Sequence, residues 1–193
     1  MLTTTTRTKT KTKTKRLTSG KIQSAAVVIT MMTSIVLAVW QIPTALATSL
    51  EEIRVSREIS APVDQVWGIV SNIDNETKYW PTFKAIKNIN KTGNTTEREV
   101  TLIAGPLGET KTRQVVTVDP GQFAVETNLT EGPVTGTRVL ALSQPAEDNT
   151  KTKIDAVWKV DLSGISILGR GFAKDGITGT TEEALGKIAQ AVE

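Results

Sequence analysis

The sequence contains neither cysteine nor histidine among its 193 residues. Without cysteine there is no disulfide, no thiol nucleophile and no cysteine-based zinc site. Without histidine the chain lacks the commonest metal ligand and the one side chain that ordinarily titrates near neutral pH. Carboxylate catalysis and calcium binding through oxygen ligands stay open on composition alone. No set of residues has a spacing diagnostic of either, so we predict no metal site, no cofactor and no assignable catalytic residue.

Acidic residues are missing from one part of the chain, residues 1–47. Seven of the 23 basic residues and none of the 20 acidic residues lie there, which leaves 16 basic against 20 acidic residues in 48–193. The first segment therefore has a net charge of +7 and the remainder −4. Nucleic-acid binding needs clustered cations that displace counterions from phosphate, so we expect no nucleic-acid partner for the acidic part.

Residues 1–24 are a basic, threonine-rich segment of low complexity. Such a composition buries too little apolar surface to offset the entropy of ordering, which predicts a disordered cytoplasmic n-region. A contact with nucleic acid or anionic lipid is the alternative interpretation of these charges.

Residues 25–47 form an uncharged, apolar run that admits two outcomes. Ala45-Leu46-Ala47 follows Pro43 and has the small residues of a signal-peptide cleavage site, so cleavage after Ala47 would release a secreted domain. Uncleaved, the run would form roughly 34 Å of helix, enough to cross a bilayer as an anchor. The positive charges before it predict that the N-terminus stays cytoplasmic, so both outcomes place residues 48–193 outside the cytoplasm.

Four Asn-x-Ser/Thr sequons fit an extracytoplasmic location and are candidate glycosylation sites. Their asparagines are Asn75, Asn90, Asn94 and Asn128.

Residues 48–193 are predicted to form one α+β domain. Seven strands alternate with short turns, which indicates that consecutive strands are antiparallel neighbours. The last strand has the clearest pattern, because Trp158 and its apolar neighbours share one parity while charged residues share the other. The expected strands are Ile53–Ile59, Phe83–Asn90, Thr95–Ala104, Thr110–Val118, Gln122–Leu129, Thr137–Ser143 and Thr152–Leu162.

Helical periodicity occurs in two places. Val63, Val66, Trp67 and Val70 predict a short helix after the first strand, with Ser60 as its N-cap and a second turn at 76–80. A long C-terminal helix is predicted from apolar positions at helical spacing, namely Ile177, Thr181, Ala184, Leu185, Ile188 and Val192.

This order of elements, together with Ala61-Pro62-Val63-Asp64-Gln65-Val66-Trp67 and the turn Trp80-Pro81-Thr82-Phe83, resembles the START-related polyketide cyclase/dehydrase and lipid-transfer superfamily (SRPBCC). The resemblance covers about 53–193. It implies a helix-grip fold, in which a seven-stranded curved antiparallel sheet wraps around a long C-terminal helix, with two short helices after the first strand. It also implies an internal apolar cavity for a lipid, isoprenoid, polyketide or similar ligand.

Candidate cavity residues follow from parity and from the expected fold. Arg138 shares a parity with Leu140 and Leu142, so it would anchor a carboxylate or phosphate head group if that face is internal. The alternative is a rim or solvent-facing arginine paired with an acid such as Asp155. The full set of candidates is Trp67, Trp80, Arg138, Leu140, Trp158, Phe172 and Ile177.

Several of these candidates have a second interpretation. Trp67 and Trp80 would either touch a ligand or belong to the core. Phe172 and Ile177 would either form a lid over the cavity or pack against the sheet. The glycines of 169–179 would leave volume for a ligand under the helix, act as a hinge, or mark a loosely packed segment.

The function expected from the sequence is binding of a hydrophobic small molecule or lipid, with transport or sequestration as its purpose. An enzyme of polyketide cyclase/dehydrase type is the first alternative. The second is a surface interaction module that binds partners through an exposed strand edge or glycans, which a cavity filled by side chains would favour. A buried carboxylate of raised pKa facing Arg138 or Tyr79 would favour the enzyme.

Overall fold

The computed structural model describes residues 50–103, 108–146 and 148–193. The predictions for 1–24 and 25–47 lie outside these ranges and stay predictions. Within the ranges, none of the helices combines the length and hydropathy that a bilayer crossing requires.

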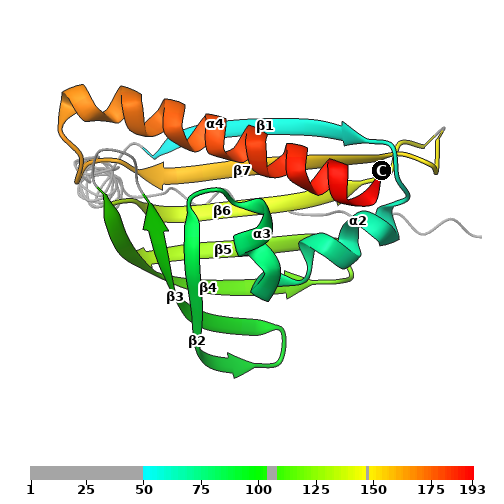
Figure 1. The fold of residues 1–193 in the computed structure, drawn as a ribbon, viewed down its shortest axis with the longest axis horizontal. Helices are drawn as coiled ribbons and strands as arrows, with labels where there is room; N and C mark the ends of the chain where they lie inside the picture. Colours follow the sequence, from blue (N-terminus) through cyan, green and yellow to red (C-terminus); the bar gives the residue numbers. More distant parts are fainter. Residues whose placement is uncertain (1–49, 104–107, 147) are drawn as a thin grey trace, which may run out of the picture. The chain divides into compact units, whose positions relative to one another are not determined.

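A single antiparallel sheet of seven strands is the framework of the described part, and its order is β1-β7-β6-β5-β4-β3-β2 (Figure 1). Consecutive strands from β2 to β7 are antiparallel neighbours, and β1 closes the order beside β7. The strands are β1 Glu51–Ile59, β2 Phe83–Thr92, β3 Thr95–Ile103, β4 Glu109–Asp119, β5 Ala124–Glu131, β6 Thr135–Ser143 and β7 Thr152–Asp161.

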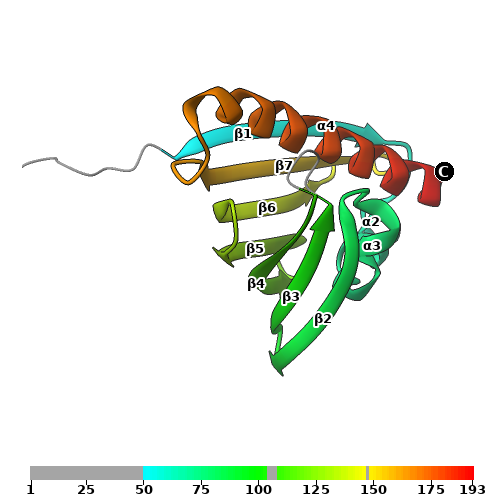
Figure 2. The same ribbon diagram turned by 60° about the vertical axis from the view of Figure 1, so that its left-hand side comes forward.

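Besides the sheet, the described residues form three α-helices and one 3₁₀ turn. Figures 1 and 2 show the long helix α4 running across one face of the curved sheet, with α2 next to the end of β1 and α3 beside β2. The α+β helix-grip fold predicted from the sequence is confirmed. The helices are α2 Val63–Val70, α3 Glu76–Tyr79 and α4 Ile167–Val192, and the 3₁₀ turn η1 is Ile73–Asn75.

The concave face of the sheet is buried in the way that two-residue periodicity predicts. On β7, Ile154, Ala156, Trp158 and Val160 are buried, while Lys153 and Lys159 face solvent. One predicted detail is wrong: Ser60 does not cap α2, because the helix begins one residue after Pro62 and has no side-chain cap.

Helix α4 is buried only in its second half. The fully buried positions are Thr181, Ala184, Leu185, Ile188 and Ala189, which confirms the predicted apolar face, whereas no residue of 167–180 is fully buried. Gly171, Gly176 and Gly179 are exposed, and a Cβ added at any of them would meet nothing within 4 Å. These three glycines therefore do not leave ligand volume under the helix, and that interpretation is wrong for them.

We expect Gly176→Ala and Gly179→Ala each to stabilise the protein by up to about 1 kcal/mol, because alanine restricts the unfolded chain and meets no steric obstacle here. Urea unfolding monitored by circular dichroism would measure the gain. A loss of stability in either variant would contradict the open surroundings of these positions.

Candidate functional site

Polar side chains occupy much of the concave face that β3 to β6 present to the helices. Arg98 lies opposite Gln114 in the β3–β4 pairing, and Arg138 lies opposite Thr127 in the β5–β6 pairing. Strand alternation sends all four side chains inward. The buried polar residues on these strands are Thr96, Arg98, Thr112, Gln114, Thr127 and Arg138.

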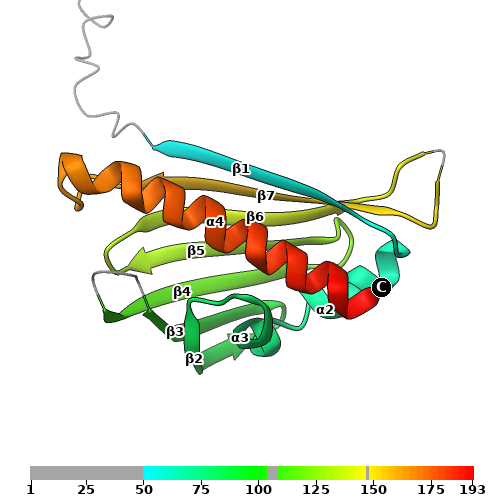
Figure 3. The same cartoon turned by 45° about the horizontal axis from the view of Figure 1, so that its top comes forward.

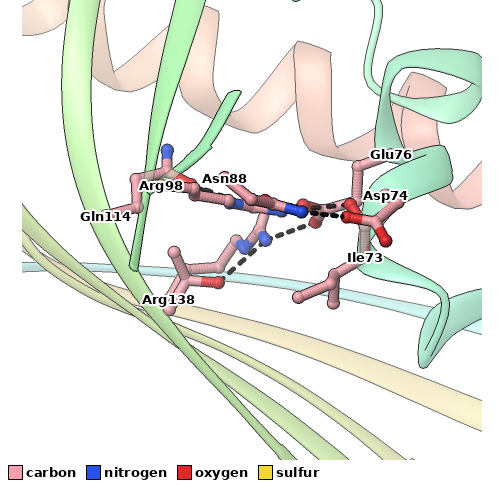
Figure 4. Close-up of polar contacts among 8 residues, drawn as sticks. Ile73, Asp74, Glu76, Asn88, Arg98, Gln114 and Arg138 are labelled. Carbon is pink, nitrogen blue, oxygen red and sulfur yellow. Dashed lines mark hydrogen bonds and ion pairs between the residues drawn. The ribbon is translucent and has the colours of Figure 1, made fainter. Parts of the chain in front are cut away.

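Glu76 is the carboxylate that meets the two arginines. It is the first residue of α3, which places its side chain over the concave face (Figure 4). Its Oε1 accepts a hydrogen bond of 2.6 Å from Arg138 Nη2, and its Oε2 forms an ion pair with Arg98 Nη2. Arg98 and Arg138 are 0% and 1% exposed, so this ion triad is closed off from water.

Neutral groups complete the coordination of Arg98. Its Nε and Nη2 donate to Gln114 Oε1 at 3.1 and 2.9 Å, and its Nη1 donates to the Ile73 carbonyl at 3.0 Å. Arg98 thus ties two strands to the segment between α2 and α3 (Figure 4).

Arg138 is held differently, by aromatic rings. Its guanidinium carbon lies 4.4 Å from the ring centroid of Trp80, 5.5 Å from that of Trp158 and 6.0 Å from that of Phe83. Such contacts stabilise a cation through the negative faces of the rings. Nη2 also donates to Thr127 Oγ1 at 2.9 Å, but the buried Nε has no hydrogen-bond partner in the described part of the chain.

The triad, two guanidinium groups and one carboxylate, has a net charge of +1. Among the described residues no second carboxylate pairs with either arginine. A buried charge without a counter-ion costs several kcal/mol. The interior is therefore electrostatically matched to an additional anionic group.

Electrostatics keep the carboxylate ionised. Burial alone would raise the pKa of Glu76, but the charges of Arg138 and Arg98 and their hydrogen bonds outweigh burial and lower that pKa below its ordinary value. For Arg138, burial lowers the pKa, the charge of Glu76 raises it, and the charge of Arg98 lowers it further. Glu76 therefore holds no proton to donate near neutral pH.

The structure brings together three of the candidates predicted from sequence: Trp80, Arg138 and Trp158. The rings of Trp80 and Trp158 are 5.9 Å apart at a steep angle, and Trp158 Nε1 donates to Thr181 Oγ1 of α4 at 3.1 Å. Leu140, two residues along β6 from Arg138, is a buried core residue.

The other candidates lie apart from this group. Trp67 is half-buried and packs edge-on against Phe123 at 5.6 Å, and Ile177 is half-buried against the core. Phe172 is 79% exposed, so its predicted packing against the sheet is wrong. Asn90, Asn94 and Asn128 are exposed and Asn75 is half-buried, so their glycosylation stays a prediction.

Arg138 is not the solvent-facing partner of Asp155, which was one of its two interpretations. Asp155 instead contacts Ser56 and pairs with Lys153 at 3.0 Å. Sequence reasoning did not select Glu76 or Arg98. The alternation of Glu97 and Glu99 on the outer face could have placed Arg98 inward, but nothing local to Glu76 indicated its partners.

A depression about 440 Å³ in volume lies between β1 and α4 rather than at the triad. It is polar and open, and its lining residues are Arg54, Val55, Ser56, Arg57, Glu182 and Leu185. No group of three or more potential metal-ligating side chains occurs in the described ranges.

A curved antiparallel sheet with a long C-terminal helix across its concave face defines a helix-grip protein. The chain belongs to the family described as polyketide cyclase / dehydrase and lipid transport, whose model matches residues 51–193. No curated protein sequence matches the chain significantly.

Solved structures share the fold at low sequence identity. The Thermus thermophilus protein TTHA0849 superposes with a TM-score of 0.63 and 16% identity over 74% of this chain and 97% of that one. The Zhui aromatase/cyclase from Streptomyces sp. R1128 gives 0.59 and 12% over 74% and 91%. The di-domain aromatase/cyclase BexL from the BE-7585A biosynthetic pathway gives 0.62 and 14% over 90% and 61%.

Proposed function

We propose that this protein binds a small amphipathic molecule whose acidic or enolic oxygen pairs with Arg138. The observation that carries the proposal is the buried, net-positive triad with an unpartnered Nε on Arg138. Trp80 and Trp158 flank the same guanidinium and offer apolar surface for the rest of the ligand. Aromatic side chains combined with a few polar groups are typical of small-molecule sites, and the family description includes lipid transport.

Binding without covalent chemistry is favoured by the state of Glu76. A general acid would need a raised pKa, and the pKa of Glu76 is lowered. As a base, its two oxygens are already engaged by two arginines, which weakens their affinity for a proton. The buried carboxylate thus lacks the property that would have favoured an enzyme.

A polyketide cyclase or dehydrase is the second candidate, and one observation supports it. Two guanidinium groups directed toward one buried spot would stabilise an enolate oxygen during carbon–carbon bond formation. Incubation with a linear poly-β-ketone thioester, followed by mass spectrometry, distinguishes the candidates: a cyclised or dehydrated product supports the enzyme, and an unchanged bound thioester supports binding.

The binding proposal predicts a preference for acids over matched alcohols that depends on Arg138. With intrinsic tryptophan fluorescence as the readout, the full chain should bind oleate about tenfold or more tightly than oleyl alcohol, since a hydrogen bond to a charged group contributes about 1.5–3 kcal/mol. Arg138→Met should remove this preference while the protein stays folded, because Glu76 and Arg98 remain as a neutral pair.

Arg113→Met is the matched control, because Arg113 on β4 is partly exposed and makes surface ion pairs with Glu97 and Glu131. It should keep the preference of the unmodified chain. Equal affinities for acid and alcohol in the unmodified chain, or an unaltered preference in Arg138→Met, would argue against the proposed anchor. Native mass spectrometry with lipid extraction would then identify what the protein retains from its own cells.

A further inference from the structure

The first turns of α4 present large apolar side chains to solvent. Ile167, Leu168 and Phe172 are 82%, 87% and 79% exposed. At 3.6 residues per turn they lie within an arc of about 140° on the helix. We call these three residues the α4 ridge. Exposed apolar groups that gather on one face mark an interaction site more often than scattered ones do.

The ridge continues into a bare helix surface. Gly171, Gly176 and Gly179 are exposed, and a Cβ at these positions would meet nothing within 4 Å. No part of the described fold covers this outer side of 167–179. Asp175, the one acidic residue of these turns, is exposed and lies within the same arc as the ridge, about one turn beyond Phe172. In the described fold this face is therefore uncovered, and it combines three large apolar side chains with one carboxylate at its far end.

The α4 ridge lies close to the point where the chain enters the domain. Lys174, two residues beyond Phe172, pairs with Glu51 at the start of β1 at 3.4 Å. The start of β1 and the first half of α4 lie at the same end of the molecule in all three views (Figure 3).

The occupant of the ridge follows from what precedes β1 in the sequence. The uncharged apolar run 25–47 ends four residues before Glu51, so at most about 14 Å of extended chain separates the two. The run has the length and composition to cross a bilayer. Once it is embedded, the adjacent helix end is within reach of the lipid surface.

We propose that the α4 ridge inserts into a lipid surface. An amphipathic helix lies in the interface with its apolar side chains at the boundary of head groups and acyl chains. Arg170 and Lys174 are exposed next to the ridge. Arg170 donates to the Ile165 and Ser163 carbonyls and Lys174 pairs with Glu51, so their remaining donors are the ones that suit anionic head groups. This contact with lipid is independent of the ligand proposed for the interior.

The absence of cysteine makes a direct test simple, because any introduced cysteine is unique. Phe172→Cys and Leu168→Cys in the full chain are labelled with an environment-sensitive fluorophore. Each is reconstituted into vesicles of phosphatidylcholine and phosphatidylglycerol, with and without bromine on the acyl chains. Glu126→Cys, exposed on the outer face of β5, is the matched control.

We expect brominated lipid to quench the fluorophore at 168 and 172 about twofold or more, because only a probe at the acyl boundary is reached by the bromine. The probe at 126 should be unaffected. A probe at 172 that is not quenched overturns the proposal, even if its emission shows an apolar environment, since protein rather than lipid would then cover the ridge. If the fluorophore at 168 or 172 enters an apolar environment only at a high protein-to-lipid ratio, a second copy of the chain covers the ridge, and the proposal is also overturned.

Discussion

Replacement of Glu76 by glutamine is expected to destabilise the protein by about 3–5 kcal/mol. The substitution keeps the shape of the side chain but removes the carboxylate that both buried arginines share. The guanidinium charges of Arg98 and Arg138 would then lie in the interior without a counter-charge and would repel each other. Urea unfolding at neutral pH, followed by circular dichroism, measures the loss of unfolding free energy.

The matched control is Glu183→Gln on α4. Glu183 pairs with Lys187 one turn away on the surface, at 2.8 Å. Exposed ion pairs of this kind contribute about 0.3–0.5 kcal/mol, so this variant should remain close to the unmodified protein. A loss of similar size in both variants would mean that the buried triad has no special energetic role.

The pH dependence of the same comparison follows from the lowered pKa of Glu76. A carboxyl group whose pKa is lower in the folded state stabilises the fold at every pH above its ordinary pKa. That contribution is lost as the pH falls through the lowered folded-state pKa. The difference between the unmodified chain and Glu76→Gln should therefore be largest near neutrality and shrink in acid, and a difference that grows in acid would contradict the ionised state of Glu76.

Replacement of Gly136 by alanine is expected to cost about 3–5 kcal/mol, combining backbone strain with steric overlap. Gly136 lies in β6 between β5 and β7 and has φ +127°, a conformation that other residues rarely adopt. An added Cβ would lie 2.2 Å from the Lys159 carbonyl oxygen and 2.8 Å from the Val160 Cα. Backbone atoms cannot move aside as a flexible side chain would, so β6 and β7 would have to move apart at this point.

Gly171→Ala is the control for this substitution, because Gly171 is an exposed helical glycine with open space around it. It should raise stability by up to about 1 kcal/mol. Both variants replace glycine by alanine, but the first is expected to lower the free energy of unfolding and the second to raise it. A urea midpoint for Gly136→Ala near that of the unmodified chain would show that β6 and β7 tolerate a wider separation than the structure has.

Replacement of Arg138 and replacement of Glu76 should have different main effects, the first on the preference for acids and the second on stability. Arg138→Met leaves Glu76 and Arg98 as a neutral pair, so its main effect is on the ligand. Glu76→Gln leaves two positive charges, so its main effect is on folding. A bound acid should partly restore the stability of Glu76→Gln, because the ligand would supply the missing negative charge.

Most of the fold was predictable from the sequence because it rests on local rules. Two-residue alternation placed Trp158 and Ile154 on the buried face of β7, and turn residues separated the strands. Alternation also made Arg138 an interior candidate. It left open whether the arginine faced the cavity or solvent, since parity alone does not say which side of a sheet is covered.

The partner of Arg138 was decided only by the tertiary structure. Glu76 is 62 residues away in sequence from Arg138 and 22 from Arg98, and nothing local links the three. These three side chains meet because α3 lies over the concave face and because the register of the strands from β3 to β6 brings Arg98 and Arg138 beneath it. Charge balance in an interior is a sum over such distant contacts, so it has no signature in a single segment.

In helix α4, too, the sequence determined one property and the tertiary structure another. Its sequence determined a long helix with an apolar face, and that face is buried from Thr181 onward. How far along the helix the burial extends was decided by the sheet, because only the turns that lie over its concave face lose their water. Ile167, Leu168 and Phe172 are as apolar as the buried positions, yet they remain exposed at the end of the molecule where the chain enters. Composition thus determined what these side chains are, and the length and curvature of the sheet decided what was left for them to contact.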